Sequence, residues 1–228
     1  MNANLRFGCT EAVQNSLEKG GGTLRDVITG AVADCERILD VFWGQPVNAL
    51  TSLGFSLAGA WLIRRRPERR MVGIALIGVG LGSFLFHGPM PPGAQWAHDV
   101  TLGWLLVVVG LDAIGRIRYA WPALAILGVV IAVAPGLSDP LAVAGTVFVV
   151  GAFLFRPGWR TSIPPLLLLG VAAVAGRLAA TDGPLCRPES LLQVHGLWHL
   201  SAAAAVTWWA MLPPVPTAAP QPRAESTI

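Results

Sequence analysis

Two pairs of polar residues with a four-residue spacing carry the clearest chemistry in this sequence. Ser83 and His87 form one pair, and His195 and His199 form the other. Residues four apart share one face of a helix, so each pair can present both side chains to one site. A carboxylate, Asp99, follows the first pair after a proline-rich turn. Imidazoles and carboxylates at this spacing are the groups from which metal-dependent hydrolytic sites are built.

Three imidazoles with an open fourth position are typical of catalytic zinc. We therefore predict a zinc site in which His195 and His199 bind from one helix and His87 binds from another. Asp99 is suited to accept a proton from an attacking water and to return it to the leaving group. Ser83 lies one helical turn before His87, where its hydroxyl can hydrogen-bond the water or the oxyanion of an attacked carbonyl.

Each of these residues also has an ordinary structural explanation. A single HxxxH pair is a weak metal signal, and Ser83 could serve close helix packing beside Gly80 and Gly82. Asp99 could cap the N-terminus of its helix. His98 is expected either to support a metal ligand without binding the metal, or to lie at the membrane interface. The case for a site therefore depends on whether the fold brings these residues together.

The composition indicates that the positioning elements are membrane helices. The 228-residue chain is 54% hydrophobic and 13% charged, whereas a soluble domain carries roughly 25% charged residues. There is no basic patch interleaved with aromatic residues and no nucleic-acid motif, so nucleic acid is not expected as a partner.

Seven apolar segments have lengths near the ~20 residues that span a bilayer. They cover residues 47–63, 71–87, 94–114, 119–135, 140–155, 163–180 and 191–212. We therefore predict an all-α membrane protein with seven transmembrane helices, forming one hydrolase domain over residues 46–212.

Two flanking regions complete the predicted organisation. Residues 1–45 are predicted to form an extracytoplasmic segment, and the proline-rich residues 213–228 a disordered cytoplasmic tail. Apolar residues follow helical spacing between positions 24 and 39. They predict a short amphipathic helix that either lies on the membrane surface or packs on the loops.

Arginines alternate between the loops and predict the orientation. The loops after the first, third and fifth segments hold Arg64, Arg65, Arg66, Arg69, Arg70, Arg116, Arg118, Arg156 and Arg160. The loops after the second and fourth segments hold no basic residue. By the positive-inside rule the N-terminus is outside and the C-terminus cytoplasmic. All the candidate site residues then lie at the outer ends of the second, third and seventh helices.

These motifs together resemble the CREST superfamily of seven-helix membrane hydrolases, and within it the bacterial relatives of the alkaline ceramidases. The resemblance covers roughly residues 34–212. It is carried by CERILDVFWGQPVNALTSLGF at 35–55, GSFLFHG at 82–88, Asp99, and LCRPESLLQVHGLWHL at 185–200.

The resemblance implies a site and a reaction. It makes His87, His195 and His199 the zinc ligands, Asp99 the acid and base, and Ser83 the group that stabilises the water and the oxyanion. The family reaction is hydrolysis of the amide bond of ceramide to a sphingoid base and a fatty acid. A lipid is therefore the expected partner, either ceramide or a related N-acyl lipid.

The resemblance also implies a disulfide between Cys35 and Cys186. The predicted topology places both cysteines outside, where an oxidising compartment permits the bond. With the Ala, Gly, Pro and Arg bias of the chain, the resemblance favours a bacterial inner membrane, with the active site facing the periplasm.

Eukaryotic members of the family bind calcium near the corresponding Cys-Glu segment. Glu36 matches one acidic ligand, but Gln45 stands in place of the second acid and Ile38 in place of an amide. Ca²⁺ requires several oxygen ligands. Calcium binding through Glu36 is therefore expected only if Asp34 or Asp40 compensates.

A receptor is the alternative to a zinc-dependent intramembrane hydrolase. The related progestin and adiponectin receptors suggest a seven-helix lipid sensor in which zinc is structural. Structural zinc is closed by four protein ligands. A fourth ligand supplied by His98 or Asp99 would favour the receptor, and an open position the hydrolase.

Overall fold

The computed structural model describes residues 34–155 and 158–213, which form α-helices and no β-strand. The helices are α3 (Pro46–Arg65), α4 (Arg70–His87), α5 (Ala94–Ala113), α6 (Ala120–Val133), α7 (Ser138–Leu154), α8 (Ile163–Leu178) and α9 (Val194–Met211). Each coincides with one predicted apolar segment to within about three residues at either end. The all-α prediction is confirmed.

The predicted amphipathic helix is wrong where the structure describes it. Residues 34–45 form turns and bends instead of a helix, and residues 24–33 lie outside the described part. Cys35 has a φ of 70°, which is not helical. The backbone N–H groups of Cys35 and Arg37 bond to the loop between α8 and α9. These long-range bonds replace the local bonds of a helix. The predicted tail at 213–228 lies outside the described residues except for its first residue.

Several helices suit a membrane. In the described part of the chain five helical stretches are long and apolar enough to cross one: Pro46–Arg65, Pro67–His87, Ala94–Ala113, Pro135–Leu154 and Trp159–Leu178. The apolar stretch Ile117–Val133 is shorter, and α9 carries two histidines that lower its hydropathy. Apolar side chains face outward, with Leu57 73%, Val133 80% and Val171 69% exposed. Soluble proteins rarely expose apolar surfaces this broad to water. In a membrane, lipid chains would cover them.

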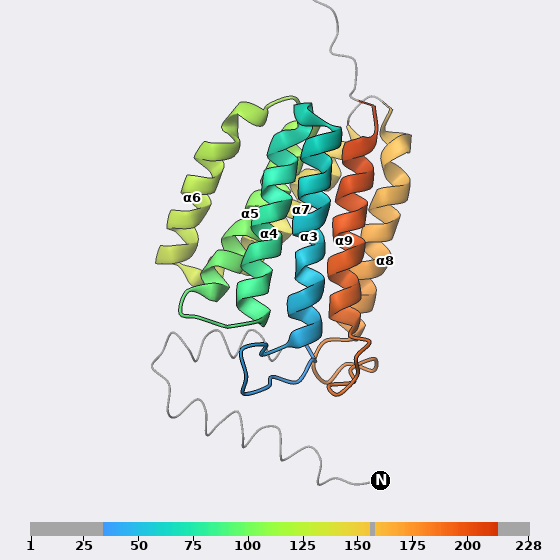
Figure 1. The fold of residues 1–228 in the computed structure, drawn as a ribbon. Coiled ribbons are helices and arrows are strands. Elements are labelled where there is room, and N and C mark those ends of the chain that lie inside the picture. Colours follow the sequence, from blue (N-terminus) through green and yellow to red (C-terminus); the bar gives the residue numbers. More distant parts are fainter. Residues whose placement is uncertain (1–33, 156–157, 214–228) are drawn as a thin grey trace, which may run out of the picture.

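The bundle places α3 between α4 and α9, with α5 on the other side of α4 (Figure 1). Two glycines allow α4 to approach both neighbours. A Cβ atom on Gly80 would lie 2.7 Å from the backbone nitrogen of Ser56 in α3, and one on Gly82 would lie 2.9 Å from the carbonyl oxygen of Ala97 in α5. Small residues at such positions bring helix backbones together. The end of α4 is thereby held close to α3 and α5.

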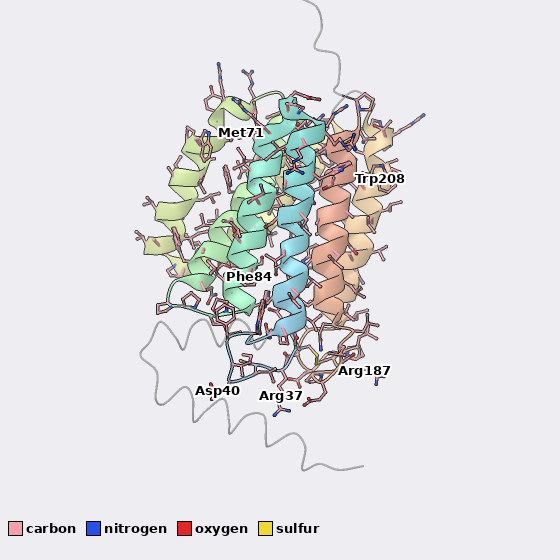
Figure 2. All side chains as sticks on the ribbon, viewed as in Figure 1. Arg37, Asp40, Met71, Phe84, Arg187 and Trp208 are labelled. Atoms are coloured by element: carbon pink, nitrogen blue, oxygen red, sulfur yellow. A yellow bond between two sulfur atoms is a disulfide. The ribbon has the colours of Figure 1, made fainter. Side chains whose placement is uncertain are left out.

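The two ends of the bundle differ in character. Figure 2 shows Met71 and Trp208 near one end, and Arg37, Asp40 and Arg187 at the other. The second end gathers three segments that are distant in sequence: residues 34–45, the turn at 88–93 and the α8–α9 loop at 179–193 (Figure 1). The C-terminal end of α4 and the N-terminal ends of α5 and α9, which carry the predicted site residues, meet there.

Candidate metal centre

His87 is the last residue of α4 and is fully buried. Its Nδ1 lies 2.7 Å from Oε1 of Gln45, the residue before α3. The Gln45 amide is oriented by its other end, because Nε2 donates to the backbone carbonyl of Glu36 at 2.8 Å. An amide oxygen can only accept, so Nδ1 of His87 carries the proton and Nε2 presents a lone pair.

His199 is oriented by two hydroxyls of α3. Its Nδ1 lies 3.2 Å from Oγ1 of Thr51 and 3.3 Å from Oγ of Ser52. Thr51 donates its own hydrogen to the carbonyls of Val47 and Asn48, and Ser52 donates to that of Asn48. Each hydroxyl has one hydrogen, so both accept from Nδ1–H of His199. The lone pair of His199 is then on Nε2.

His195 has an acidic neighbour from outside the bundle. Its Nδ1 lies 3.3 Å from Oδ1 of Asp34, whose Oδ2 is 3.9 Å from Nδ1 of His87. Burial raises the pKa of Asp34, and the electrostatic influence of the neighbouring His195 and His98 side chains opposes that rise. The Asp34 side chain is 19% exposed. Among the described residues, Nε2 of His195 is buried without a hydrogen-bond partner.

The three histidines converge on one point. One ligand atom from each lies within 4.8 Å of the other two, so the group could hold a metal ion. The ring centroids are 5.1 Å (His87 to His195), 5.3 Å (His87 to His199) and 4.6 Å (His195 to His199) apart. Within the described part of the chain, Nε2 of His87 is buried without a partner, as is Nε2 of His195. Buried lone pairs without partners are unfavourable, and a cation would satisfy them. The residues present therefore fit a metal.

The remaining predicted residues lie on α4 and α5, the first of which carries His87. Ser83 is buried on α4, one turn before His87. Asp99 and His98 form a pair on α5, with 2.8 Å between Oδ1 and Nδ1. The His98 ring stacks on Phe86 at 4.8 Å and lies 6.2 Å from the His87 ring. His98 is thus bonded to Asp99 in the structure, and its support of a metal ligand stays a prediction.

Glu36 has a structural role at the start of α3. Its two carboxylate oxygens accept the backbone N–H groups of Val47 and Asn48, each at 2.8 Å. A carboxylate at a helix N-terminus is favourable because it satisfies unpaired donors. Burial raises the pKa of Glu36, and these two bonds oppose the rise. Asp34, one acid that could have compensated for the missing calcium ligands, lies against His195 instead. Calcium binding stays a prediction.

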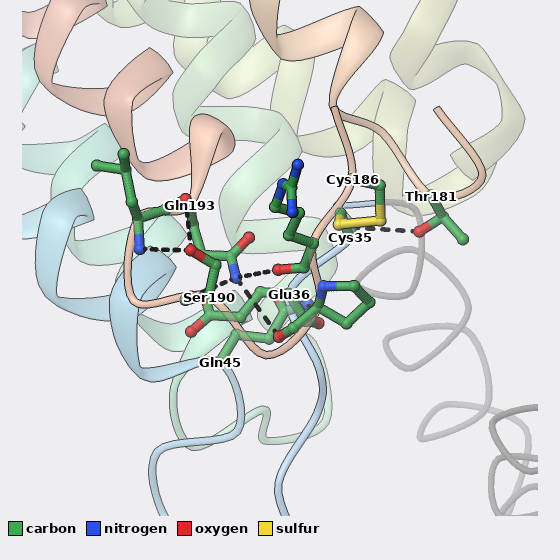
Figure 3. The surroundings of a disulfide bond; sticks show 10 residues. Cys35, Glu36, Gln45, Thr181, Cys186, Ser190 and Gln193 are labelled. Carbon is green, nitrogen blue, oxygen red and sulfur yellow. Dashed lines mark hydrogen bonds between the residues drawn. A yellow bond between two sulfur atoms is a disulfide. The ribbon is translucent and has the colours of Figure 1, made fainter. Parts of the chain in front are cut away.

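The disulfide implied by the family resemblance is present. Cys35 and Cys186 are bonded, and their Cα atoms are 5.5 Å apart (Figure 3). The Cys35 N–H donates to Oγ1 of Thr181, and the Arg37 N–H to the carbonyl of Pro188. The disulfide therefore links the segment before α3 to the loop before α9.

Sequence reasoning missed, as part of the zinc centre, the groups that lie beside the Nδ1 atoms of the three histidines. They are Asp34, Gln45, Thr51 and Ser52. A signal was present, because Gln45, Asn48 and Ser52 recur at helical spacing at the N-terminal end of an apolar segment. All three are fully buried. Polar residues at the end of a membrane helix indicate a site, and this rule applies to the first segment as it does to the second, third and seventh.

Comparison with known proteins identifies no relative of this chain. No protein-family model matches the chain, and no curated protein and no solved structure matches it. A functional assignment therefore depends on the arrangement of the site and on the motif resemblance alone.

Proposed function

We propose that this protein is a zinc-dependent hydrolase of the membrane that cleaves the amide bond of ceramide or a related N-acyl lipid. The products are a free fatty acid and an amine, which is a sphingoid base when the substrate is ceramide. One observation carries the proposal: all three histidines have their Nδ1 atoms turned to protein partners. This leaves the three Nε2 atoms as ligands, an arrangement typical of metal centres.

The choice of zinc follows from the ligand set. Imidazole nitrogens suit Zn²⁺, and three protein ligands with an open fourth position are characteristic of its catalytic sites. Among the described residues, the cluster of potential ligands holds three histidines and no fourth histidine, cysteine or carboxylate. Zinc bound there would polarise the attacking water and the amide carbonyl.

The surrounding residues supply the proton transfers. Asp99 would take a proton from the attacking water and deliver it to the amide nitrogen as the C–N bond breaks. Its Oδ1 is held by His98, so Oδ2 is the oxygen assigned to the water. The Ser83 hydroxyl would donate a hydrogen bond to the carbonyl oxygen as negative charge develops. The hydroxyl of water thus stays on the acyl carbon and its hydrogen goes to the amine.

A lipid substrate follows from the location. The apolar outward faces of the helices suit acyl chains, and the site lies where α4 ends and α9 begins. We propose that seven helices cross a bacterial inner membrane and that the site faces the periplasm, as the arginine-rich loops at the other end favour.

The test is release of fatty acid from defined lipids by the protein purified in detergent. Ceramide, an N-acylethanolamine and an N-acyl amino acid with the same acyl chain would be compared. We expect release from at least one, loss with 1,10-phenanthroline, and recovery with Zn²⁺. Asp99→Asn should keep the metal but lose roughly 10²–10⁴-fold in kcat.

The outcomes separate the two candidate functions. Equal rates for wild type and His199→Ala would rule out catalysis at this centre. Tight zinc binding and saturable lipid binding, with no product from any of the lipids, would support the receptor instead. Zinc would then be expected to have four protein ligands.

A further inference from the structure

Asp34 approaches the histidine cluster from outside the helical bundle. It precedes α3 in the irregular segment 34–45, yet its carboxylate lies 3.3 Å from Nδ1 of His195 and 3.9 Å from Nδ1 of His87. In the sequence it stands out only as an acid that could supplement a calcium site, not as part of the zinc centre.

We propose that Asp34 is a positioning residue of the metal centre, which accepts the Nδ1–H of His195 and so directs Nε2 of that ring toward His87 and His199. The inference rests on the metal centre of the proposed function. It assigns Asp34 no contact with the metal, because the carboxylate lies on the Nδ1 edge of the ring and the converging lone pairs are on Nε2.

Asp34 gives His195 the kind of partner that the other two histidines obtain from α3 or the residue before it. Gln45 orients His87, and the Thr51 and Ser52 hydroxyls orient His199, all from α3 or the residue before it. In the described part of the chain, Asp34 is the acceptor that the structure places beside Nδ1 of His195. A carboxylate in this position fixes the tautomer of the ring and makes it a stronger ligand.

The disulfide holds Asp34 in place. Cys35, the next residue, is bonded to Cys186 in the loop that leads into α9, and its N–H bonds to Thr181 of the same loop (Figure 3). On the other side, the Glu36 carboxylate is bonded to the N-terminus of α3. Asp34 is thus fixed relative to α9, which carries His195, and relative to α3.

The experiment measures metal affinity, with Co²⁺ as the spectroscopic probe and Zn²⁺ by competition against a chelator. Asp34→Asn and Asp34→Ala should each bind both metals about 10–100-fold more weakly than wild type. Asp34→Glu should recover part of the loss. The control is Asp139→Asn, an exposed acid in the first turn of α7, which should bind as wild type does.

Two further readouts separate positioning from other roles. At saturating Co²⁺ the visible spectrum of Asp34→Asn should equal that of wild type, because the ligands are unchanged; a changed spectrum would make Asp34 a ligand and overturn the proposal. The metal-free variant should unfold at the same temperature as metal-free wild type. If the metal-free variant unfolds at a lower temperature, and this loss of stability is large enough to explain its weaker metal binding, the proposal is also overturned.

The result for wild type distinguishes this inference from the function on which it rests. If wild type binds no metal, the proposed function and the inference both fail. If wild type binds zinc and Asp34→Asn binds it equally well, only the inference fails.

The role of the disulfide is tested by a double-mutant cycle. Replacing both Cys35 and Cys186 by serine should weaken metal binding in the same direction as Asp34→Asn. Combining the changes should add little, because both act through one carboxylate. Reduction of the folded wild type provides the same comparison if the serine variant does not accumulate. Independent, additive losses would show that the disulfide does not act through Asp34.

Discussion

Gly196 of α9 lies directly against Thr51 of α3: a Cβ atom added to the glycine would lie 3.0 Å from the threonine hydroxyl oxygen. This contact falls between His195 and His199 in the sequence and beside the hydroxyl that orients His199. The close approach of the two helices therefore helps to set the geometry of the histidine cluster.

Gly196→Val should damage both stability and metal binding. The added side chain would push α9 away from α3, and overpacking of this kind typically lowers the free energy of unfolding by about 1–3 kcal/mol. Thermal unfolding and Zn²⁺ competition would measure the two effects. Gly170→Val on α8 is the control, since nothing lies within 4 Å of a Cβ atom there. Equal metal affinity in the two variants would contradict a role for this contact.

Gln45→Leu should weaken metal binding about 10–100-fold. The leucine cannot accept the Nδ1–H of His87, so the ring loses the bond that directs Nε2 into the cluster. Gln45→Glu retains an acceptor and should bind metal more tightly than Gln45→Leu. Gln95→Leu on α5 controls for loss of a glutamine elsewhere. Equal metal affinities with leucine and glutamate at position 45 would contradict this role of Gln45.

Thr51 and Ser52 should act redundantly on His199. Either hydroxyl can accept the Nδ1–H, so Thr51→Val or Ser52→Ala alone should change metal affinity little. The double variant should lose more than the sum of the two single losses, and isothermal titration with Zn²⁺ would show it. Thr146→Val, which removes an exposed hydroxyl on α7, should have no effect. Strictly additive losses would argue against a shared role.

A substitution at the opposite end of the bundle should lower stability without changing metal binding. Arg69 is buried, lies 2.8 Å from Asp112 of α5 and packs over the Trp209 ring of α9 at 4.7 Å. Arg69→Met should lower the free energy of unfolding by about 3 kcal/mol, because a buried ion pair loses one partner.

The exposed Arg37–Glu189 pair provides the comparison for this effect. Its 3.0 Å separation is similar, but surface pairs contribute only about 0–1 kcal/mol. Arg37→Met should therefore unfold close to wild type, and both variants should bind one metal per chain. Loss of metal in Arg69→Met, measured on the folded fraction, would show that the two ends are coupled.

The helices could be predicted from the sequence because apolar runs and their breaks are local signals. Pro89, Pro91 and Pro92 mark the turn between α4 and α5, and the arginines mark the loops at the other end. The convergence of His87 with His195 and His199 could be anticipated from the alternation of the helices, since all three fall at the same end of the bundle.

The groups beside the Nδ1 atoms of the histidines could not be predicted from local signals in the same way. Gln45 and Asp34 act through contacts between elements distant in sequence, and a contact of this kind leaves no periodic pattern. The error at residues 34–39 has the same origin. Helical spacing of apolar residues is a local preference, and the disulfide and the bonds to the α8–α9 loop override it.

The most direct test of the account is the metal content of the purified protein. Elemental analysis of wild type, prepared in detergent without added chelator, should give about one zinc per chain, because three convergent Nε2 ligands form one site. His87→Ala should hold far less, and Asp99→Asn should hold as much as wild type. A folded wild-type protein with no bound zinc, and no zinc uptake on titration, would contradict the central claim.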